Sequence, residues 1–247
     1  MPDLLVLFLA ASATALATGF GAIPVLLLGA RAAALTPFLL GVAAGVMGVA
    51  SVVGLLLPAA DEGSFWELLA GFAAGAVLLG VARRRFNHEA VFMGRSGPSA
   101  RTAALVFVVL FVHSLPEGLA VGTAYASERA GLGLFVIVAI AIQNIPEGTS
   151  VAIPMEAAGY GRGRQFWAAV ATSAPQPIGA VIAYLAVEQV NALLPFSFAF
   201  AAGAMLTLIA IELLPQAYED RRRWRGPTLG LLGGAAVMIA LDLALGV

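Results

Sequence analysis

The sequence predicts an all-α membrane protein with eight transmembrane helices. Hydrophobic residues make up 61% of the 247 residues and charged residues only 11%. Charged residues account for about a quarter of an ordinary soluble domain, so this chain has too few charges to cover a soluble surface. The apolar residues also fall into long segments separated by short charged or Pro/Gly-rich breaks, and each segment approaches the length that crosses a bilayer. Lipid must therefore solvate most of the surface.

The breaks divide the chain into eight predicted spans. They lie at 4–29, 36–57, 65–82, 102–126, 131–154, 165–187, 195–214 and 227–246. The first span contains A-x-A-like triplets, but its early charge is Asp3 rather than a basic residue, so we expect a spanning helix and not a cleaved signal peptide. The connections are short except for 83–101, which is too small to fold as a domain. We therefore expect one membrane domain over 1–247.

The arginines predict how the chain is oriented. All 13 basic residues are Arg, and the loops after spans 1, 3, 5 and 7 hold twelve of them. These twelve are Arg31, Arg83, Arg84, Arg85, Arg95, Arg101, Arg162, Arg164, Arg221, Arg222, Arg223 and Arg225. The opposite side carries only Arg129, beside the acidic residues Asp61, Glu62, Glu67, Glu128 and Glu188. Because cytoplasmic loops are enriched in arginine, the odd loops are expected in the cytoplasm and both termini outside it.

Composition also excludes several kinds of chemistry. The chain has no Cys, which rules out disulfides, thiolate metal ligands and thiol catalysis. A formal net charge of −1 gives no indication of a nucleic-acid partner. An intramembrane zinc protease would usually carry H-E-x-x-H, and this pattern is absent.

Two similar polar motifs lie inside apolar spans. "HSLPEGLAVG" begins at His113 and "QNIPEGTSVA" begins at Gln143, and both contain Pro-Glu-Gly. Counted from the span ends, His113 lies 11 residues into span 4 and Gln143 lies 12 residues into span 5. At about 1.5 Å per residue, both reach the middle of a hydrocarbon core about 30 Å thick. The same count places Met47 of span 2 and Gln176 of span 6 at this depth.

Each motif presents several donors on one helix face. His113 and Glu117 are separated by four residues, as are Gln143 and Glu147, so each pair lies on the same side of its helix. Ser114 and Asn144 precede the glutamates by three residues and widen these two faces.

The carboxylates of the two motifs call for a partner. A charge at this depth costs at least about 2.5–3.5 kcal/mol, and no Arg or Lys lies at the depth of Glu117 and Glu147. Polar residues in spans also serve as simple helix–helix hydrogen bonds, which is the structural alternative. A bound cation is the natural counter-charge. Because His113 adds an imidazole to the carboxylates, the donor set favours Zn²⁺ or a neighbouring divalent transition metal over Mg²⁺ or Ca²⁺.

These motifs resemble the ZIP (Zrt-, Irt-like protein) family of divalent metal transporters, and within it the GufA-like bacterial branch. The resemblance covers essentially the whole chain. "GFGAIPVLLLG" and "LLGVAAGVMGVAS" are similar to the family's first two spans, and the two Pro-Glu-Gly motifs to its metal-binding fourth and fifth spans. "SAPQPIGA" and "IELLPQA" are similar to its sixth and seventh spans.

The resemblance implies a transport site between spans 4 and 5. Its primary ligands would be His113, Glu117, Gln143 and Glu147, with Met47 alongside. A second metal position, bridged by the two glutamates, would use Ser114, Asn144 and Gln176. The family commonly has Asn, a carboxylate and Glu at these three places, so this chain departs from the pattern. We therefore expect one well-held metal and a weak or empty second position.

The resemblance further implies a homodimer in the bacterial cytoplasmic membrane. Its expected architecture is a 3+2+3 arrangement in which spans 1–3 and 6–8 are inverted repeats. The implied activity is alternating-access movement of Zn²⁺, and also Cd²⁺, Fe²⁺ or Mn²⁺, toward the cytoplasm. The metal would be cargo rather than a cofactor, and no enzymatic activity is expected.

Several alternatives remain open at this level. A metal-selective channel, a membrane-embedded metalloenzyme and a metal sensor are the competing functions. Glu212, near the cytoplasmic end of span 7, is either a guide for departing metal or a capping or snorkelling residue. His88, in the long loop, is either a metal contact or an ordinary solvated residue.

Overall fold

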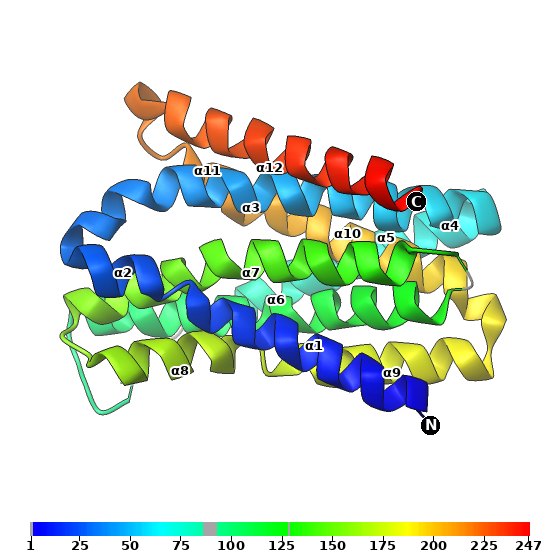
Figure 1. Cartoon of the computed structure of the whole chain (residues 1–247), viewed down its shortest axis with the longest axis horizontal. Coiled ribbons are helices and arrows are strands. Elements are labelled where there is room, and N and C mark those ends of the chain that lie inside the picture. Colours follow the sequence, from blue (N-terminus) through cyan, green and yellow to red (C-terminus); the bar gives the residue numbers. More distant parts are fainter. Residues whose placement is uncertain (1, 86–92, 128) are drawn as a thin grey trace.

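A computed structural model describes residues 2–85, 93–127 and 129–247 (Figure 1). Most residues in these ranges are helical, and none of them forms a strand. The long helices are α1 (Pro2–Phe20), α3 (Thr36–Ser51), α5 (Phe65–Arg85), α6 (Pro98–Ala126), α7 (Leu132–Ala157), α9 (Pro175–Gln189), α10 (Leu194–Leu208) and α12 (Arg225–Leu245). His88 and Glu128 lie outside the described residues.

Shorter helical segments extend or join the long ones. They are α2 (Ile23–Leu28), η1 (Gly29–Leu35), η2 (Val52–Leu56), α4 (Leu57–Glu62), α8 (Arg162–Thr172), η3 (Asn191–Leu193), η4 (Ile209–Leu213), α11 (Leu214–Ala217) and η5 (Arg221–Arg223). Span 2 of the sequence thus runs through α3, η2 and α4, and span 7 runs through α10, η4 and α11.

The prediction of an all-helical membrane protein is confirmed. Seven helical stretches among the described residues are long and apolar enough to cross a membrane: Asp3–Leu28, Arg31–Glu62, Pro98–Ala126, Leu132–Ala157, Arg162–Gln189, Asn191–Ala217 and Arg225–Leu245. Each overlaps a predicted span. The remaining predicted span, 65–82, corresponds to α5, whose apolar part Phe65–Val81 is shorter than the others. The count of eight therefore stays a prediction.

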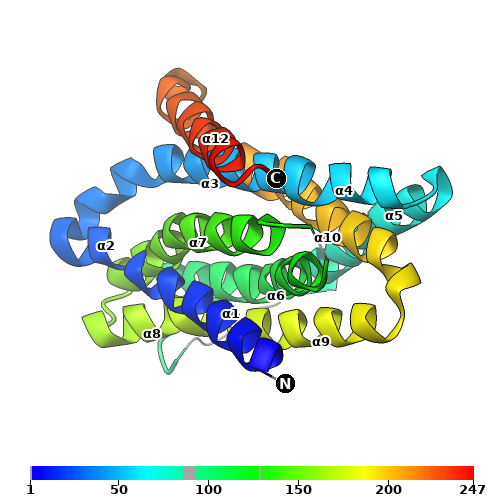
Figure 2. The ribbon, with the colours of Figure 1, turned by 45° about the vertical axis from the view of Figure 1, so that its right-hand side comes forward.

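The helices form three layers, with α6 and α7 in the middle (Figures 1 and 2). On one side α3 packs along α12 and α5 packs along α10. On the other side α6 packs along α9, and α7 packs along α1. The layer with α3, α5, α10 and α12 meets the middle layer through the contacts of α3 with α7 and of α10 with α6. The middle pair is consequently enclosed on both sides.

Spans 2 and 7 carry the same local irregularity. Each contains a π-helical segment, Val52–Leu56 in η2 and Ile209–Leu213 in η4. Each segment is followed two residues later by a proline, Pro58 or Pro215. Because proline has no N–H to donate, a widened turn is a common local adjustment in front of it. The match between the two spans is what an inverted repeat would produce.

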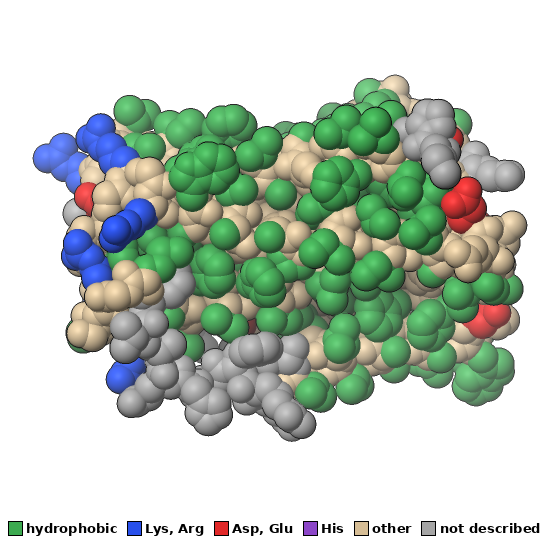
Figure 3. Space-filling model, turned by 90° about the horizontal axis from the view of Figure 1, so that it is seen from below, with side chains coloured by type: hydrophobic (Ala, Val, Ile, Leu, Met, Phe, Trp, Pro, Cys, Tyr) green, Lys and Arg blue, Asp and Glu red, His purple; other side chains and the backbone are tan. Residues whose placement is uncertain are grey.

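The surface separates by charge along the long axis of the molecule. Both termini lie at the end that contains α4, and arginine side chains gather at the opposite end, with apolar side chains between the ends (Figures 1 and 3). Exposed apolar residues such as Leu27, Trp66 and Leu243 have between 73% and 78% of their surface accessible. In water such a surface would be unfavourable, so the apolar band is the part that contacts lipid.

Candidate metal site

The two Pro-Glu-Gly motifs face each other in the middle layer. α6 and α7 run side by side, and His113, Glu117, Gln143 and Glu147 are all at least 95% buried. Gln143 Nε2 donates a hydrogen bond to Glu117 Oε1 over 2.8 Å, which joins the two motifs directly. The structure therefore brings the polar faces predicted for spans 4 and 5 together.

A second amide reaches Glu117 from α9. Gln176 Nε2 donates to Glu117 Oε2 over 2.6 Å, so each oxygen of this carboxylate accepts one amide hydrogen bond. The approach depends on Gly118, because a Cβ at this position would overlap the backbone carbonyl of Gln176. The glycine beside the glutamate lets α9 pack close enough for the hydrogen bond to form.

Asn144 and Gln176 continue this network. Their side-chain amides are joined by Asn144 Nδ2 donating to Gln176 Oε1 over 3.1 Å and Gln176 Nε2 donating to Asn144 Oδ1 over 3.2 Å. Asn144 Nδ2 also donates to the backbone carbonyl of Thr14 over 2.6 Å. Thr14 Oγ1 lies 3.0 Å from Gln176 Oε1 and 2.7 Å from the backbone carbonyl of Ala11, and its one hydrogen is shared between these two acceptors. Two of the residues expected at a second metal position, Asn144 and Gln176, thus belong to a network of neutral amides and a hydroxyl.

The role of Thr14 was not predicted. The available signal was the spacing of Thr14 and Thr18, which places both hydroxyls on one face of the first span. In the structure Thr18 Oγ1 lies 2.6 Å from Ser173 Oγ, just before α9. Span 1 therefore contributes two threonines that contact the residues next to the candidate site: Thr14 contacts Asn144 and Gln176, and Thr18 contacts Ser173.

Ser114 and Met47 take different positions from these amides. Ser114 Oγ donates to the backbone carbonyl of Leu110 in its own helix over 2.9 Å, so its hydroxyl hydrogen is directed away from the amide network. Met47 is fully buried on α3, and its side chain borders the same small space as His113.

His113 and Glu147 line a cavity of about 100 Å³. Glu212 and Gln216 also line it, together with apolar residues that include Val109 and Leu110. Gln216 Nε2 donates to Glu212 Oε1 over 2.6 Å. The cavity therefore connects the middle of the molecule with residues toward the arginine-rich end.

The ligand atoms available to a cation are of several chemical types. Within the described ranges no three His, Asp or Glu side chains form a compact cluster. The buried atoms Gln143 Oε1 and Glu147 Oε1, one helical turn apart on α7, accept no hydrogen bond from the part of the chain described here. An unsatisfied buried carboxylate oxygen is costly, and a cation bound beside it would remove that cost. The imidazole, carboxylates and amides present fit a divalent transition metal.

Sequence comparisons agree with the motifs. Residues 94–242 match the sequence model of the family described as ZIP Zinc transporter. The chain is 33% identical over 242 residues to the zinc transporter GufA of Myxococcus xanthus, which covers 93% of this chain and 95% of that relative. This chain belongs to the ZIP family.

Other ZIP relatives match along most of the chain. The zinc transporter ZIPB of Bordetella bronchiseptica is 34% identical over 242 residues, which is 93% of this chain and 78% of the relative. The zinc transporter ZupT of Corynebacterium aurimucosum is 33% identical over 225 residues, which is 83% of this chain and 84% of the relative. The predicted family is confirmed, and like other ZIP proteins this chain is an integral membrane protein.

Proposed function

We propose that this protein transports a divalent transition-metal ion, with Zn²⁺ as the principal cargo, into the cytoplasm. Cd²⁺, Fe²⁺ and Mn²⁺ have related ligand preferences and are proposed as further substrates. The observation that carries the proposal is the pair Glu117 and Glu147, both almost fully buried at membrane depth with no arginine in spans 4 or 5. Carboxylates in this setting need a cation, and the relatives named as zinc transporters support a transported one.

The proposed ligands are those of the two motifs. His113, Glu147 and Gln143 would hold the metal, with Glu117 and Met47 beside them. Glu147 Oε1 and Gln143 Oε1 accept no hydrogen bond from the described residues and are ready to coordinate. Glu117 would exchange one of its amide hydrogen bonds for the metal. The chain's own contribution is to orient these groups and to exclude water around them.

We propose a single well-held metal. Gln176 donates an N–H to Glu117 Oε2. A second cation that bridges the two glutamates would need this oxygen as a ligand. Asn144 and Thr14 hold the Gln176 amide in place through hydrogen bonds, and none of these groups carries a negative charge. Two divalent ions would then share two carboxylates at close range, which is electrostatically unfavourable.

The proposed architecture is that of an eight-span transporter with both termini outside the cytoplasm. The apolar part of α5, Phe65–Val81, would extend about 26 Å, at the short end of the range that crosses a hydrocarbon core of about 30 Å. Arginine at one end of the molecule and both termini at the other support the orientation. The matched segments η2 and η4 support the 3+2+3 inverted repeat, and a homodimer in the bacterial cytoplasmic membrane completes the proposal.

The test is metal uptake into proteoliposomes. Wild-type protein is compared with His113→Ala and Glu117→Ala, and Arg162→Ala serves as a control for an exposed change away from the site. Uptake of Zn²⁺ and Cd²⁺ should fall at least about tenfold in the first two variants and stay unchanged in the control. If both site variants transport as well as wild type, the site assignment is wrong.

A metal-selective channel is the second candidate. The continuous cavity between His113 and Glu212 is the observation that favours it. The same vesicles separate the two functions, because a channel passes far more ions per second than a protein that changes conformation for each ion.

A further inference from the structure

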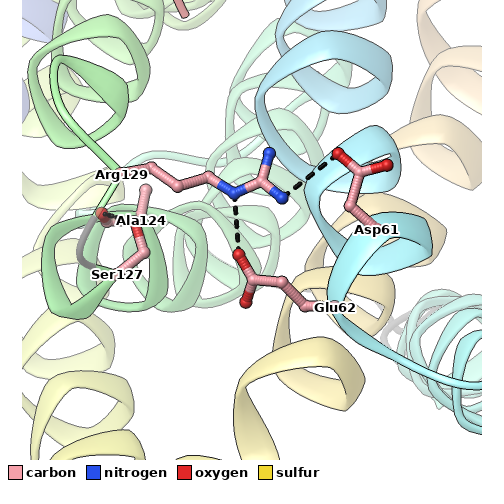
Figure 4. Close-up of polar contacts among 5 residues, drawn as sticks. All are labelled: Asp61, Glu62, Ala124, Ser127 and Arg129. Carbon is pink, nitrogen blue, oxygen red and sulfur yellow. Dashed lines mark hydrogen bonds and ion pairs between the residues drawn. The ribbon is translucent and has the colours of Figure 1, made fainter.

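Three charged residues at the end of the molecule opposite the arginine-rich end have no part in the metal site. Arg129 lies in the connection between α6 and α7, and Asp61 and Glu62 close α4 (Figure 4). Arg129 Nε is 2.7 Å from Glu62 Oε1, and Arg129 Nη2 is 3.1 Å from Asp61 Oδ2. One guanidinium therefore joins two neighbouring carboxylates, and we refer to these three residues as the latch.

The latch connects two groups of helices at this end of the molecule. Arg129 follows α6, which packs with α7, α8 and α9. Asp61 and Glu62 end α4, which follows span 2 and packs mainly on α10, η2 and α5. The groups also pack where α3 contacts α7 and α10 contacts α6, and near this end Gly54 of η2 lies against Phe135 and Gly131 lies against Leu245. At the end of α4, side-chain charges link the two groups.

The two ends of the molecule differ in access to the candidate site. On the arginine-rich side, the cavity from Glu212 reaches His113 and Glu147. At the latch, a wider hollow of about 590 Å³ is lined by residues that include Glu62, Glu67, Arg129 and Asn191. None of the predicted metal ligands lines this hollow. The cavity that reaches the candidate site thus lies toward the arginine-rich end, and the hollow at the latch is a separate one.

We propose that Arg129, Asp61 and Glu62 form an electrostatic latch that holds the extracytoplasmic end closed while the site communicates with the cytoplasm. The latch rests on the proposed transport function, since it assigns one end of an alternating-access cycle. Opening this end requires the α6–α7 connection to separate from α4, which breaks both ion pairs. The latch therefore stabilises the inward-open arrangement relative to the outward-open one.

The solvent exposure of the three side chains sets how strongly the latch shifts the equilibrium between the two arrangements. The side chains are 36% exposed for Arg129, 67% for Asp61 and 28% for Glu62. Water and salt weaken such pairs, so the ratio of outward-open to inward-open protein should rise about two- to fivefold on losing Arg129. The latch would be a bias on the equilibrium and not a lock, which suits a carrier that must open in every cycle.

The absence of Cys from the chain makes the test direct, because introduced cysteines are the only labelling sites. Spin labels on Trp66→Cys and Val190→Cys report the distance across the hollow, from an exposed position at the start of α5 to one just after α9. The measurement is made in lipid vesicles without metal. Arg129→Ala should raise the ratio of long to short distances about two- to fivefold, and Arg129→Glu should raise it further by repulsion.

Matched variants distinguish charge from folding. Arg129→Lys keeps the charge and should lie between wild type and Arg129→Ala. Combining Arg129→Glu with Glu62→Arg restores one pair and should return the ratio toward wild type. High salt should shift the wild-type ratio in the same direction as Arg129→Ala, because exposed pairs are screened. Arg162→Ala, at the other end, should leave it unchanged.

Equal distance distributions in wild type, Arg129→Ala and Arg129→Glu would overturn the latch. The readout does not depend on metal movement. A shifted distribution in a protein that transports no metal would therefore refute the transport function and leave the latch standing. Normal metal uptake with an unchanged distance distribution would refute the latch and leave the transport function standing.

Discussion

Gln176 and Glu117 are joined by a short hydrogen bond between helices that are far apart in the sequence. Gln176 Nε2 lies 2.6 Å from Glu117 Oε2, and both residues are fully buried. The partner of the carboxylate is a neutral amide, so the contact stabilises the buried oxygen without adding a positive charge. Whether a metal position is occupied beside Glu117 depends on this exchange between an N–H and a cation.

The amide network predicts one Zn²⁺ per chain. Purified protein titrated with Zn²⁺ should reach a stoichiometry of one in calorimetry. Gln176→Glu removes the N–H and adds a carboxylate, so it should tighten binding and raise the stoichiometry toward two. A wild-type structure soaked in Zn²⁺ or Cd²⁺ with two fully occupied positions would contradict this prediction.

Loss of the Gln176 amide should destabilise the metal-free protein. Gln176→Met keeps a similar shape but removes the donor to Glu117, which costs about 1–3 kcal/mol for a buried charged acceptor. The expected result is a lower midpoint of thermal unfolding in detergent. Gln216→Met, whose partner Glu212 lies at the edge of the bundle, is the matched control and should have a smaller effect. Equal midpoints for wild type and Gln176→Met would argue against this hydrogen bond.

The close approach of α6 and α9 predicts a steric effect at Gly118. Gly118→Ala would place a methyl group against the backbone of Gln176 and push the helices apart. Overpacking of this kind typically costs about 1–3 kcal/mol, and metal uptake should fall because Gln176 and Glu117 separate. Gly233→Ala on α12, where nothing lies within 4 Å of the added carbon, is the control and should retain uptake. Full uptake by Gly118→Ala would show that this spacing is not needed.

Filling the cavity should block transport without removing the ligands. Val109→Trp places a large ring in the cavity of about 100 Å³ that connects His113 with Glu212. Zn²⁺ binding to purified protein should persist, while uptake into proteoliposomes should fall at least about tenfold. Val108→Trp is a matched control, since Val108 lines a separate apolar groove between α6 and Pro175. If the two variants transport equally well, the metal takes another path.

The sequence was sufficient to predict much of the candidate site. The depth of His113 and Gln143 follows from counting residues along a helix, because each residue adds a nearly constant rise. The pairing of His113 with Glu117 on one face follows from helical periodicity. Both rest on relations within one helix, which local sequence specifies. The gathering of twelve of the thirteen arginines in alternate loops can likewise be read along the chain.

Contacts between helices were predicted less well. Ser114 was expected in a second metal position, which stays a prediction, and in the structure its hydroxyl donates to Leu110 in its own helix. Thr14 was not expected, yet it supports Asn144 and Gln176 from α1. A serine or threonine in a spanning helix has both options, its own backbone or a neighbouring helix, and the sequence does not rank them.

By itself, the sequence determined that this chain is a helical membrane protein of the ZIP family with two buried carboxylate motifs at equal depth. Composition and helical period set these features, because they act along a single helix. The tertiary structure alone decided that Gln176 meets Glu117, that the cavity reaches Glu212, and that Arg129 joins Asp61 and Glu62. Those contacts depend on how closely helices pack and which rotamers their side chains adopt once packed.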